Sequence, residues 1–357
     1  MEERLIVNSF LEKVKVDIPI IQAGMAGGIT TPELVAAVAN TGALGTVGAG
    51  YMSASTLKEN IKQIKGLTNK DFAVNLFATN LETFSTDIQE MQIFLDKYRN
   101  ELELDKGSKQ VKVNDYLQEK IYVILQENIP IVSTAFGVLS SVLIEKLKKN
   151  DVTLIGMATN LDEAKQLVEA GYDIIVAQGF EAGGHRGTFD VGKYPNGSDI
   201  GLMVLAQSFV ENLPTPVIAA GGIHSSGQID ALLSMGVAGV QLGTRFLMAK
   251  EAGTNNAYRR ALIKADTEDT VIIKVFSGRP ARAINNRFIN EAETSQVDLL
   301  PFPIQNELTK DLRAAGSEFA ISDFQSLWAG QGVGAIHKEE TVREIMDSLV
   351  ENSKEIN

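Results

Sequence analysis

The chain has 357 residues, of which 44% are hydrophobic, and this size is sufficient for one large α/β barrel or for two smaller domains. Its net charge of −12, with a pI near 4.9 and no cluster of lysine or arginine, argues against nucleic-acid and membrane-surface partners. Cysteine is absent, which excludes disulfides, thiolate metal sites and a cysteine nucleophile.

Short runs rich in Val, Ile, Leu and Ala alternate along the chain with segments of helical spacing. The runs predicted to be strands lie near Ile18–Gln22, Ala43–Val47, Phe72–Leu76, Ile129–Ser133, Val152–Met157, Tyr172–Ala177, Val217–Ala220 and Gly239–Gly243. Near-continuous apolar strands indicate a parallel sheet that is covered on both faces, and eight strand-then-helix units favour a closed TIM (β/α)8 barrel. An open, doubly wound sheet is the alternative.

Two stretches exceed what a minimal barrel requires. Residues 81–126 are polar and largely helix-compatible, which predicts a helical insertion after the third strand. Residues 251–357 contain charged helical patterns interrupted by a loop at Gly278–Arg282, which predicts a helical extension packed on a barrel of residues 1–250. A small separate subdomain is the alternative for this extension.

A glycine-rich segment, Ala177–Gly187, follows the sixth predicted strand and contains His185, one of three histidines. Glycine allows the backbone to approach a ligand closely, and histidine titrates near neutral pH. The segment therefore predicts an active-site loop, although a glycine-rich surface turn with a solvated histidine has the same composition.

The loops after the seventh and eighth strands are typical of a phosphate site in such a barrel. Gly221 and Gly222 follow one strand, and Leu242-Gly243-Thr244-Arg245 ends the other. Their backbone amides and the Thr244 hydroxyl could bind phosphate oxygens. The alternatives are a tight helix entry for the glycines and a salt-bridged barrel position for Arg245.

The spacing of the glycines after the first predicted strand bears on which phosphate-containing cofactor the chain could bind. No Walker A motif is present, and Gly24, Gly27 and Gly28 lack the dinucleotide-binding spacing, so a cofactor with one phosphate, such as FMN, is favoured. Amide side chains at predicted strand ends could hydrogen-bond its ring edge or ribityl chain. These amides are Gln22, Asn75, Gln178 and Gln241, each of which could instead cap a loop.

Other polar residues are weaker candidates. His224 is expected to cap a helix entry, His337 to face solvent, and Trp328 to pack rather than stack on a flavin. Arg279 and Arg282 could reach an anionic substrate, but ion pairs with the acidic surface are expected. The histidines lack metal-ligand spacing, so no catalytic metal is predicted.

Several motifs together resemble those of the flavin-dependent nitronate monooxygenases, class I. The resemblance spans about residues 15–335, and its motifs are Pro19–Gly28, Gln178–Gly187, Ala219–Ile223, Gln241–Phe246 and Leu327–Gly332. Gly24 stands where a proline is frequent in the family.

The resemblance implies an FMN-dependent barrel enzyme that oxidises alkyl nitronates with O2 to nitrite and a carbonyl compound. Propionate 3-nitronate is the expected substrate, in a detoxification role. His185 is the implied catalytic residue, acting on the anion or as a base. The implied FMN contacts are Gln22, Asn75, Gln178, Gly183, Gly221, Gly222, Gln241, Leu242, Gly243 and Thr244.

Two other functions fit the same motifs. Flavin-dependent enoyl-acyl-carrier-protein reductases, which use NADH, share the glycine-glycine-histidine loop, and a non-catalytic flavin or phosphate binder is the alternative outside the enzymes. No apolar run approaches the ~20 residues of a membrane span, so a cytoplasmic location is expected. A homodimer remains open.

Overall fold

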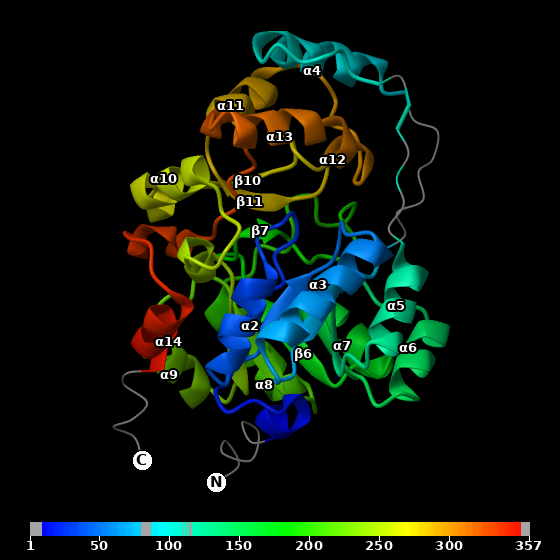
Figure 1. Cartoon of the computed structure of the whole chain (residues 1–357), viewed down its shortest axis with the longest axis vertical. Helices are drawn as coiled ribbons and strands as arrows, with labels where there is room; N and C mark the ends of the chain where they lie inside the picture. Colours follow the sequence, from blue (N-terminus) through cyan, green and yellow to red (C-terminus); the bar gives the residue numbers. More distant parts are fainter. Residues whose placement is uncertain (1–8, 80–86, 109, 112, 114–115, 351–357) are drawn as a thin grey trace.

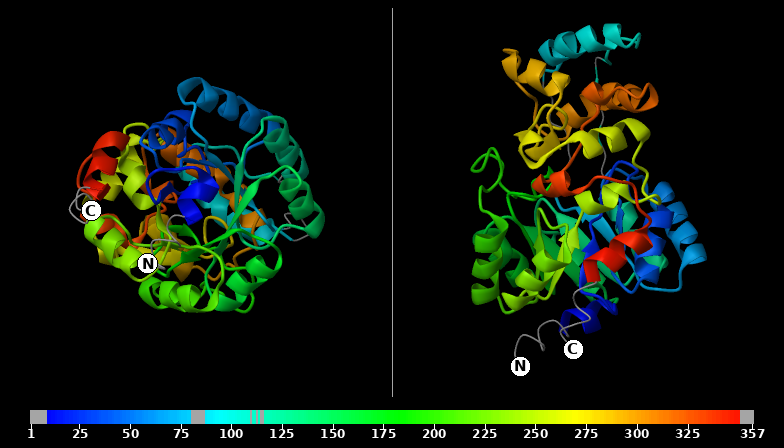
Figure 2. Two further views of the ribbon diagram at one scale, coloured as in Figure 1. Left: turned by 90° about the horizontal axis from the view of Figure 1, so that it is seen from below. Right: turned by 90° about the vertical axis from the view of Figure 1, so that its left-hand side faces the viewer.

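The computed structural model describes residues 9–79, 87–108, 110–111, 113 and 116–350. Within these residues, a barrel of parallel strands forms one layer and a smaller unit is stacked on one of its ends (Figure 1). The side view in Figure 2 shows the same two layers, and the view along the barrel shows helices surrounding it.

The barrel contains eight parallel strands in the described part of the chain. They are β1 (Ile20–Gln22), β2 (Thr46–Gly48), β3 (Ala73–Phe77), β4 (Ile131–Ala135), β5 (Thr153–Ala158), β6 (Ile174–Gln178), β8 (Val217–Ala220) and β9 (Gly239–Leu242). The sheet runs in the order β1-β9-β8-β6-β5-β4-β3-β2, and a parallel bridge between Ile21 and Leu44 closes it. The predicted TIM barrel is confirmed, and the open sheet is excluded.

The strands are apolar because both of their faces are buried. Ile174 and Val176 belong to a cluster inside the barrel, whereas Ile175 between them packs in the outer core against the helices. In β5, Ile155 likewise lies inside the barrel, and Leu154 packs in the outer core. This alternation follows from the two-residue period of a strand, and it explains the near-continuous hydrophobic runs of the sequence.

One helix follows each barrel strand and covers its outer face. These helices are α2 (Pro32–Asn40), α3 (Ala54–Leu67), α5 (Leu117–Gln126), α6 (Ser141–Lys148), α7 (Leu161–Glu169), α8 (Leu202–Asn212), α9 (Ser226–Ser234) and α14 (Val342–Val350). Side chains cap the starts of α2, α3, α7 and α9. For example, the Thr31 hydroxyl accepts a hydrogen bond from the Leu34 amide, and Pro32 occupies the first turn of α2.

The second layer, which we call the cap, packs around its own apolar cluster of buried residues from α4, β10, β11 and α11–α13. Its elements are α4 (Gln89–Glu101), β7 (Gly184–His185), α10 (Asn256–Lys264), β10 (Thr270–Ile273), β11 (Ala281–Ile284), α11 (Arg287–Thr294), α12 (Ile304–Leu308) and α13 (Lys310–Glu318). Short 3-10 turns complete the connections at Thr244–Met248, Thr267–Asp269, Ser322–Phe324 and Gln331–Ala335.

The packing groups these elements differently from the expected division at residue 250. Only α4 of the expected insertion at 81–126 joins the cap, because α5 contributes Ile121 and Ile124 to the barrel core. The last helix, α14, also returns to the barrel, where Val342 and Ile345 are buried.

The extension is also not purely helical. The predicted loop at Gly278–Arg282 is present through Pro280, but its last two residues begin strand β11. Strands β10 and β11 pair antiparallel, and β11 pairs with β7. Across the described ranges, no helix combines the length and apolar character needed to cross a membrane.

Candidate active site

A cavity lies at the carboxyl ends of the barrel strands, beneath the cap. Strand β7 lies between the two layers in Figure 1 and brings His185 to this cavity. The cavity is lined by every predicted site residue except one: Asn75, Gln178, Gly183, His185, Gly221, Gly222, Gln241, Leu242, Gly243 and Thr244. The sequence motifs, which are far apart along the chain, therefore meet at one place.

His185 is held by the cap. Its backbone pairs with Ala281 of β11, and its Nε2 lies 2.8 Å from the hydroxyl oxygen of Ser277. The Ser277 hydroxyl donates to the carbonyl oxygen of Arg279 at 3.1 Å, and its oxygen accepts from the Arg279 amide at 3.3 Å, which leaves one acceptor site for a further hydrogen bond. We therefore assign the proton of the imidazole to Nε2, which leaves Nδ1 as the basic atom.

The surroundings keep His185 neutral. Burial, together with the positive charges of Arg279 and Arg313, lowers the pKa of His185 from 6.5 to about 3. The sequence-based expectation of a histidine that titrates near neutral pH is therefore wrong. Nδ1 has no hydrogen-bond partner among the described residues.

The histidine loop is fixed to the end of β6. The Gln178 amide nitrogen donates to the His185 carbonyl at 3.1 Å, and its amide oxygen accepts from the Gly187 amide at 2.7 Å. Arg186 is fully buried and donates to the carbonyl oxygens of Gly179 and Gln178. The loop is thus a rigid part of the site and not a solvated surface turn.

The loops after β8 and β9 form a surface rich in hydrogen-bond donors. Gly221 and Gly222 have φ angles of +137° and +66°, values that favour glycine, and they lead to a capping box at Ser225 that starts α9. The Thr244 hydroxyl oxygen accepts from the Gly330 amide at 3.0 Å, which directs its own proton elsewhere. Backbone amides and a helix start suit a phosphate.

Arg245 does not supply charge to this surface as a free cation, because it forms a 2.6 Å ion pair with Glu340. The salt-bridged alternative is the one observed.

Two of the four predicted amide side chains line the cavity and can still form hydrogen bonds with a ligand. Asn75 accepts a hydrogen bond from Ser133 on its side-chain oxygen at 2.9 Å, and Gln241 is half-buried at the end of β9. Gln178 also lines the cavity, but the histidine loop occupies both ends of its carboxamide.

Gln22 is the exception, and its expected cofactor contact is corrected. Its side chain is fully buried outside the cavity lining and bridges the barrel seam, donating to the Thr46 carbonyl and accepting from the Thr46 amide at 3.1 Å. The closure of the barrel places β1 beside β2, and this explains why a polar residue at that strand end faces a neighbouring strand.

Gly24 has a steric explanation. A Cβ atom built at this position would lie 2.6 Å from the Cβ of Asn75 and 3.2 Å from the Val47 carbonyl oxygen. Glycine allows the chain after β1 to pass directly over Asn75, so the sequence departs from the family motif at a crowded part of the cavity wall.

An aromatic wall of the cavity was not identified from the sequence. Phe136 lies 5.8 Å from the His185 ring and 4.6 Å from Phe77, and Phe77 lies 5.1 Å from Tyr51, measured between ring centroids. Trp328 is 5.1 Å from the His185 ring and lines the cavity, in addition to packing on Phe276. Tyr51 and Phe136 each follow a predicted strand by a few residues, a signal that was available.

The remaining candidates have mixed outcomes. His337 is exposed as expected, and His224 is held at the entry to α9 by the Gly222 carbonyl, although it also lines the cavity. Arg279 and Arg282 do not pair with the acidic surface, which corrects that expectation. Both are buried and donate to backbone carbonyls.

No group of three or more potential metal ligands occurs within the residues that the structure describes.

Comparison with known proteins identifies relatives over the whole length of the chain. The family model described as nitronate monooxygenase matches residues 8–352. A probable nitronate monooxygenase from Staphylococcus haemolyticus (strain JCSC1435) is 37% identical over 348 residues, which is 97% of each chain. Another, from Staphylococcus aureus (strain MSSA476), is 40% identical over 327 residues, which is 91% of each chain.

Solved structures give a consistent result. The nitroalkane oxidase from Streptomyces ansochromogenes has a TM-score of 0.88 and 33% identity, covering 98% of this chain and 100% of that chain. FabK from Thermotoga maritima has a TM-score of 0.76 and 25% identity, covering 97% of this chain and 96% of that chain. The enoyl reductase domain of MlnA from Bacillus amyloliquefaciens, with 14% identity and a TM-score of 0.66, shares the fold alone.

Proposed function

Because this chain belongs to the nitronate monooxygenase family, we propose that it is an FMN-dependent enzyme that oxidises alkyl nitronates with O2 to nitrite and a carbonyl compound. We propose propionate 3-nitronate as its substrate and detoxification as its role. The observation that carries the proposal is the convergence of a half-buried, neutral histidine and a phosphate-compatible pair of loops on one cavity.

The cavity residues fit FMN. Gly221, Gly222, Gly243 and Thr244 would hold the phosphate through backbone amides and one hydroxyl, and Asn75 and Gln241 would hydrogen-bond the polar edge of the ring or the ribityl chain. When bound, the flavin supplies the electron acceptor for the nitronate and then passes electrons to O2. The protein contributes the binding site and the orientation of the substrate.

His185 is suited to a substrate that is already an anion. A nitronate needs no proton removed from carbon, and a neutral imidazole at neutral pH can contact it without a change in charge. A neutral nitroalkane needs a base, and a pKa of about 3 makes Nδ1 a weak one. We therefore expect kcat/KM for a nitronate to exceed that for its parent nitroalkane by at least about tenfold.

Anaerobic mixing tests the proposed reaction directly. The purified protein, reconstituted with FMN, is mixed with propionate 3-nitronate or, separately, with NADH while the oxidised flavin absorbance is followed. Loss of absorbance with the nitronate alone supports the proposal. A protein that binds no flavin, or that reacts with neither compound, would contradict it.

His185→Gln and Ser277→Ala separate two roles within the same reaction. If His185 contacts the substrate, H185Q lowers kcat/KM for the nitronate strongly. S277A removes the partner of Nε2 together with the hydrogen bonds of Ser277 to the Arg279 backbone, and it is expected to have a smaller effect and to change the pH dependence. Unimpaired turnover by H185Q with both nitronates and nitroalkanes would remove His185 from the mechanism.

The second candidate is an NADH-dependent enoyl-acyl-carrier-protein reductase. FabK from Thermotoga maritima has the same overall fold, but its identity and TM-score are lower than those of the nitroalkane oxidase. Rapid loss of flavin absorbance with NADH alone would favour this second function.

A further inference from the structure

Arg279 is a buried cation that lacks an anionic partner. Its side chain is 4% exposed, its Nη2 donates to the Thr188 carbonyl, and its Nε is buried without any hydrogen-bond partner in the described structure. Burial without a carboxylate is unfavourable, and it lowers the pKa of Arg279 to about 10, which still leaves the group charged at neutral pH.

Arg313 of α13 repeats this arrangement. Its Nη2 donates to the carbonyl and side-chain oxygens of Asn306, at 2.7 and 3.0 Å, while its Nε is buried and unpartnered within the described residues. Burial lowers the pKa of Arg313 as well. In both arginines, Nη1 has no hydrogen-bond partner among the described residues. Unlike Nε, this atom is not fully buried, so it remains accessible to a ligand.

The missing partner is conspicuous in so acidic a chain. The described part of the structure contains sixteen ion pairs, and they include Arg99, Arg245, Arg259, Arg287 and Arg343. No carboxylate oxygen of a described residue lies within 4.0 Å of Arg279 or Arg313. The charge of Glu163 acts on Arg279, and the charges of Glu307 and Asp311 act on Arg313, but none of these carboxylates forms an ion pair with either guanidinium.

Arg279 lies against the wall of the cavity at its catalytic end, and the charge of Arg313 also acts on this end. The guanidinium carbon of Arg279 is 4.1 Å from the ring centroid of Phe136, which lines the cavity next to His185. The charges of Arg279 and Arg313 act on both His185 and the cavity residue Tyr51. The Tyr51 hydroxyl has no hydrogen-bond partner among the described residues.

We propose that Arg279, Arg313 and Tyr51 form an anchor for a carboxylate on the far end of the nitronate substrate. This inference rests on the proposed function and adds a specificity for substrates with two anionic ends. The guanidinium groups bind the carboxylate through charge-assisted hydrogen bonds, while the nitronate end lies at His185. An uncharged alkyl tail would leave both cations without a partner, and this makes the site selective.

The test compares two nitronates of the same chain length in the FMN-loaded enzyme: propionate 3-nitronate and propyl-1-nitronate. In R313Q we expect kcat/KM for the carboxylate substrate to fall about 10- to 100-fold, mainly through KM. For propyl-1-nitronate we expect a change of less than about threefold. R287Q is the matched control, because Arg287 is a cap arginine that pairs with Glu101 at the surface.

A binding measurement provides a second readout that does not depend on turnover. Butyrate is expected to raise the Tm of the wild-type enzyme and of R287Q, whereas butanol, its uncharged counterpart, is not. In R313Q and in R279K, which keeps the charge but loses the planar fork, the butyrate effect is expected to disappear or shrink. If R313Q does not fold, R279K alone tests the anchor in this measurement.

The outcomes separate the anchor from the reaction. Equal losses for both nitronates in R313Q, or an undiminished butyrate effect in both variants, would overturn the anchor while leaving nitronate oxidation intact. If wild-type enzyme oxidises neither nitronate but butyrate still discriminates the variants, the proposed reaction fails and the anion site stands.

Discussion

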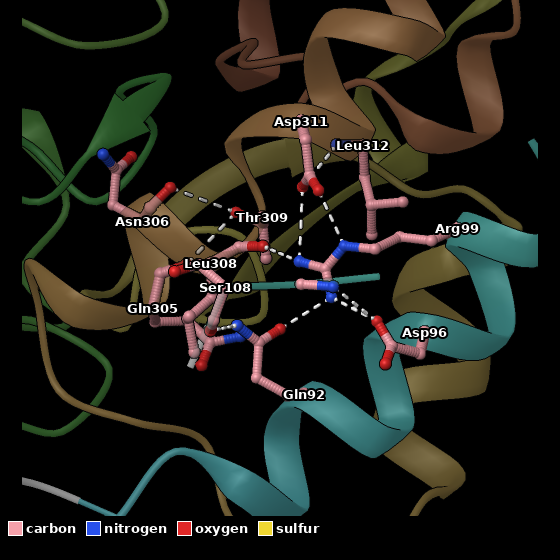
Figure 3. Close-up of polar contacts among 11 residues, drawn as sticks. Gln92, Asp96, Arg99, Ser108, Gln305, Asn306, Leu308, Thr309, Asp311 and Leu312 are labelled. Atoms are coloured by element: carbon pink, nitrogen blue, oxygen red, sulfur yellow. Dashed lines mark hydrogen bonds and ion pairs between the residues drawn. The ribbon is translucent and has the colours of Figure 1, made fainter. Parts of the chain in front are cut away.

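Two buried arginines, Arg99 in α4 and Arg279 beside the cavity, differ in whether their guanidinium group has a carboxylate partner. Arg99 is 2% exposed and pairs with Asp311 at 2.6 Å and Asp96 at 2.8 Å, and it also donates to the Gln92 side chain and the Leu308 carbonyl (Figure 3). Arg279 is almost as buried, yet it has no carboxylate partner and leaves its Nε unsatisfied.

The electrostatic consequences are opposite. Burial lowers the pKa of Arg99, but the hydrogen bonds and charges of Asp311 and Asp96 outweigh it, so the net pKa is raised. For Arg279, burial outweighs the opposing influence of Glu163 and Tyr51, and its pKa is lowered. The charge of Arg99 is neutralised by carboxylates inside the cap, and its hydrogen bonds connect α4 to α12 and α13. In the proposed anchor, the charge of Arg279 serves a ligand instead, which would offset its cost in stability.

The largest effect is expected from breaking the satisfied network with Arg99→Met. Asp311 is 43% exposed and Asp96 is 23% exposed, so water can solvate the carboxylates that remain, and we expect a loss of about 2–4 kcal/mol in free energy of unfolding, which is less than for a wholly buried pair. Urea denaturation followed by tryptophan fluorescence measures it, because Trp328, the only tryptophan in the chain, packs against the cap.

The matched control for this change is Arg287→Met, which breaks an exposed ion pair with Glu101 in the same layer. Surface pairs contribute less than about 1 kcal/mol. Equal losses in the two variants would mean that the Arg99 network does not hold α4 to the cap.

The second prediction concerns how the stability of the protein depends on pH through His185, whose pKa is lowered by burial and by Arg279 and Arg313. Because the folded-state pKa of His185 is about 3 and the unfolded value is 6.5, the unfolded chain binds an extra proton between these pH values. Stability is therefore lost as the pH falls below 6.5, and the penalty is absent above it. The loss at pH 5 is about 2 kcal/mol, from 1.5 pKa units.

His185→Gln removes this penalty, so the stability difference between the variant and wild type should shift toward the variant by about 2 kcal/mol between pH 8 and pH 5. Denaturation of the flavin-free proteins at both pH values measures the shift. A difference that is the same at both pH values would show that His185 titrates normally in the folded protein.

The third prediction tests whether the cations act on the histidine. Removing one charge in Arg313→Gln should raise the pKa of His185 by about one unit, because Arg313 and Arg279 both disfavour the imidazolium. Titration of the imidazole by NMR measures the change, with Arg287→Gln as the control for a distant cap charge. An unchanged pKa would leave burial as the only cause.

The sequence predicted the barrel well because its signals are local. Strands buried on both faces are apolar throughout, and the glycines at 221 and 222 are required by their own φ angles. The cavity residues at strand ends followed from the fold, since the carboxyl ends of parallel strands converge.

The failures involve partners that are distant in sequence. Gln22 was expected to contact the cofactor, but barrel closure places it against Thr46 across the seam. Strand β7 has two residues and exists only because β11 pairs with it. The contacts of α4 with the cap include an ion pair between Arg99 and Asp311 across 212 residues of sequence. No local pattern encodes such contacts.

The smallest effect is expected from Arg279→Met, and it is the sharpest test of the comparison. Methionine keeps the length and apolar contact of the side chain over Phe136 while removing a charge that is buried without a carboxylate. The lost hydrogen bond to Thr188 opposes the relief of desolvation, so we expect the free energy of unfolding to change by less than about 1 kcal/mol. A loss as large as that of Arg99→Met in the same urea experiment would show that Arg279 is a structural residue. A small loss, together with weaker use of the carboxylate-bearing nitronate, would show that the guanidinium is retained for binding, because stability alone does not require it.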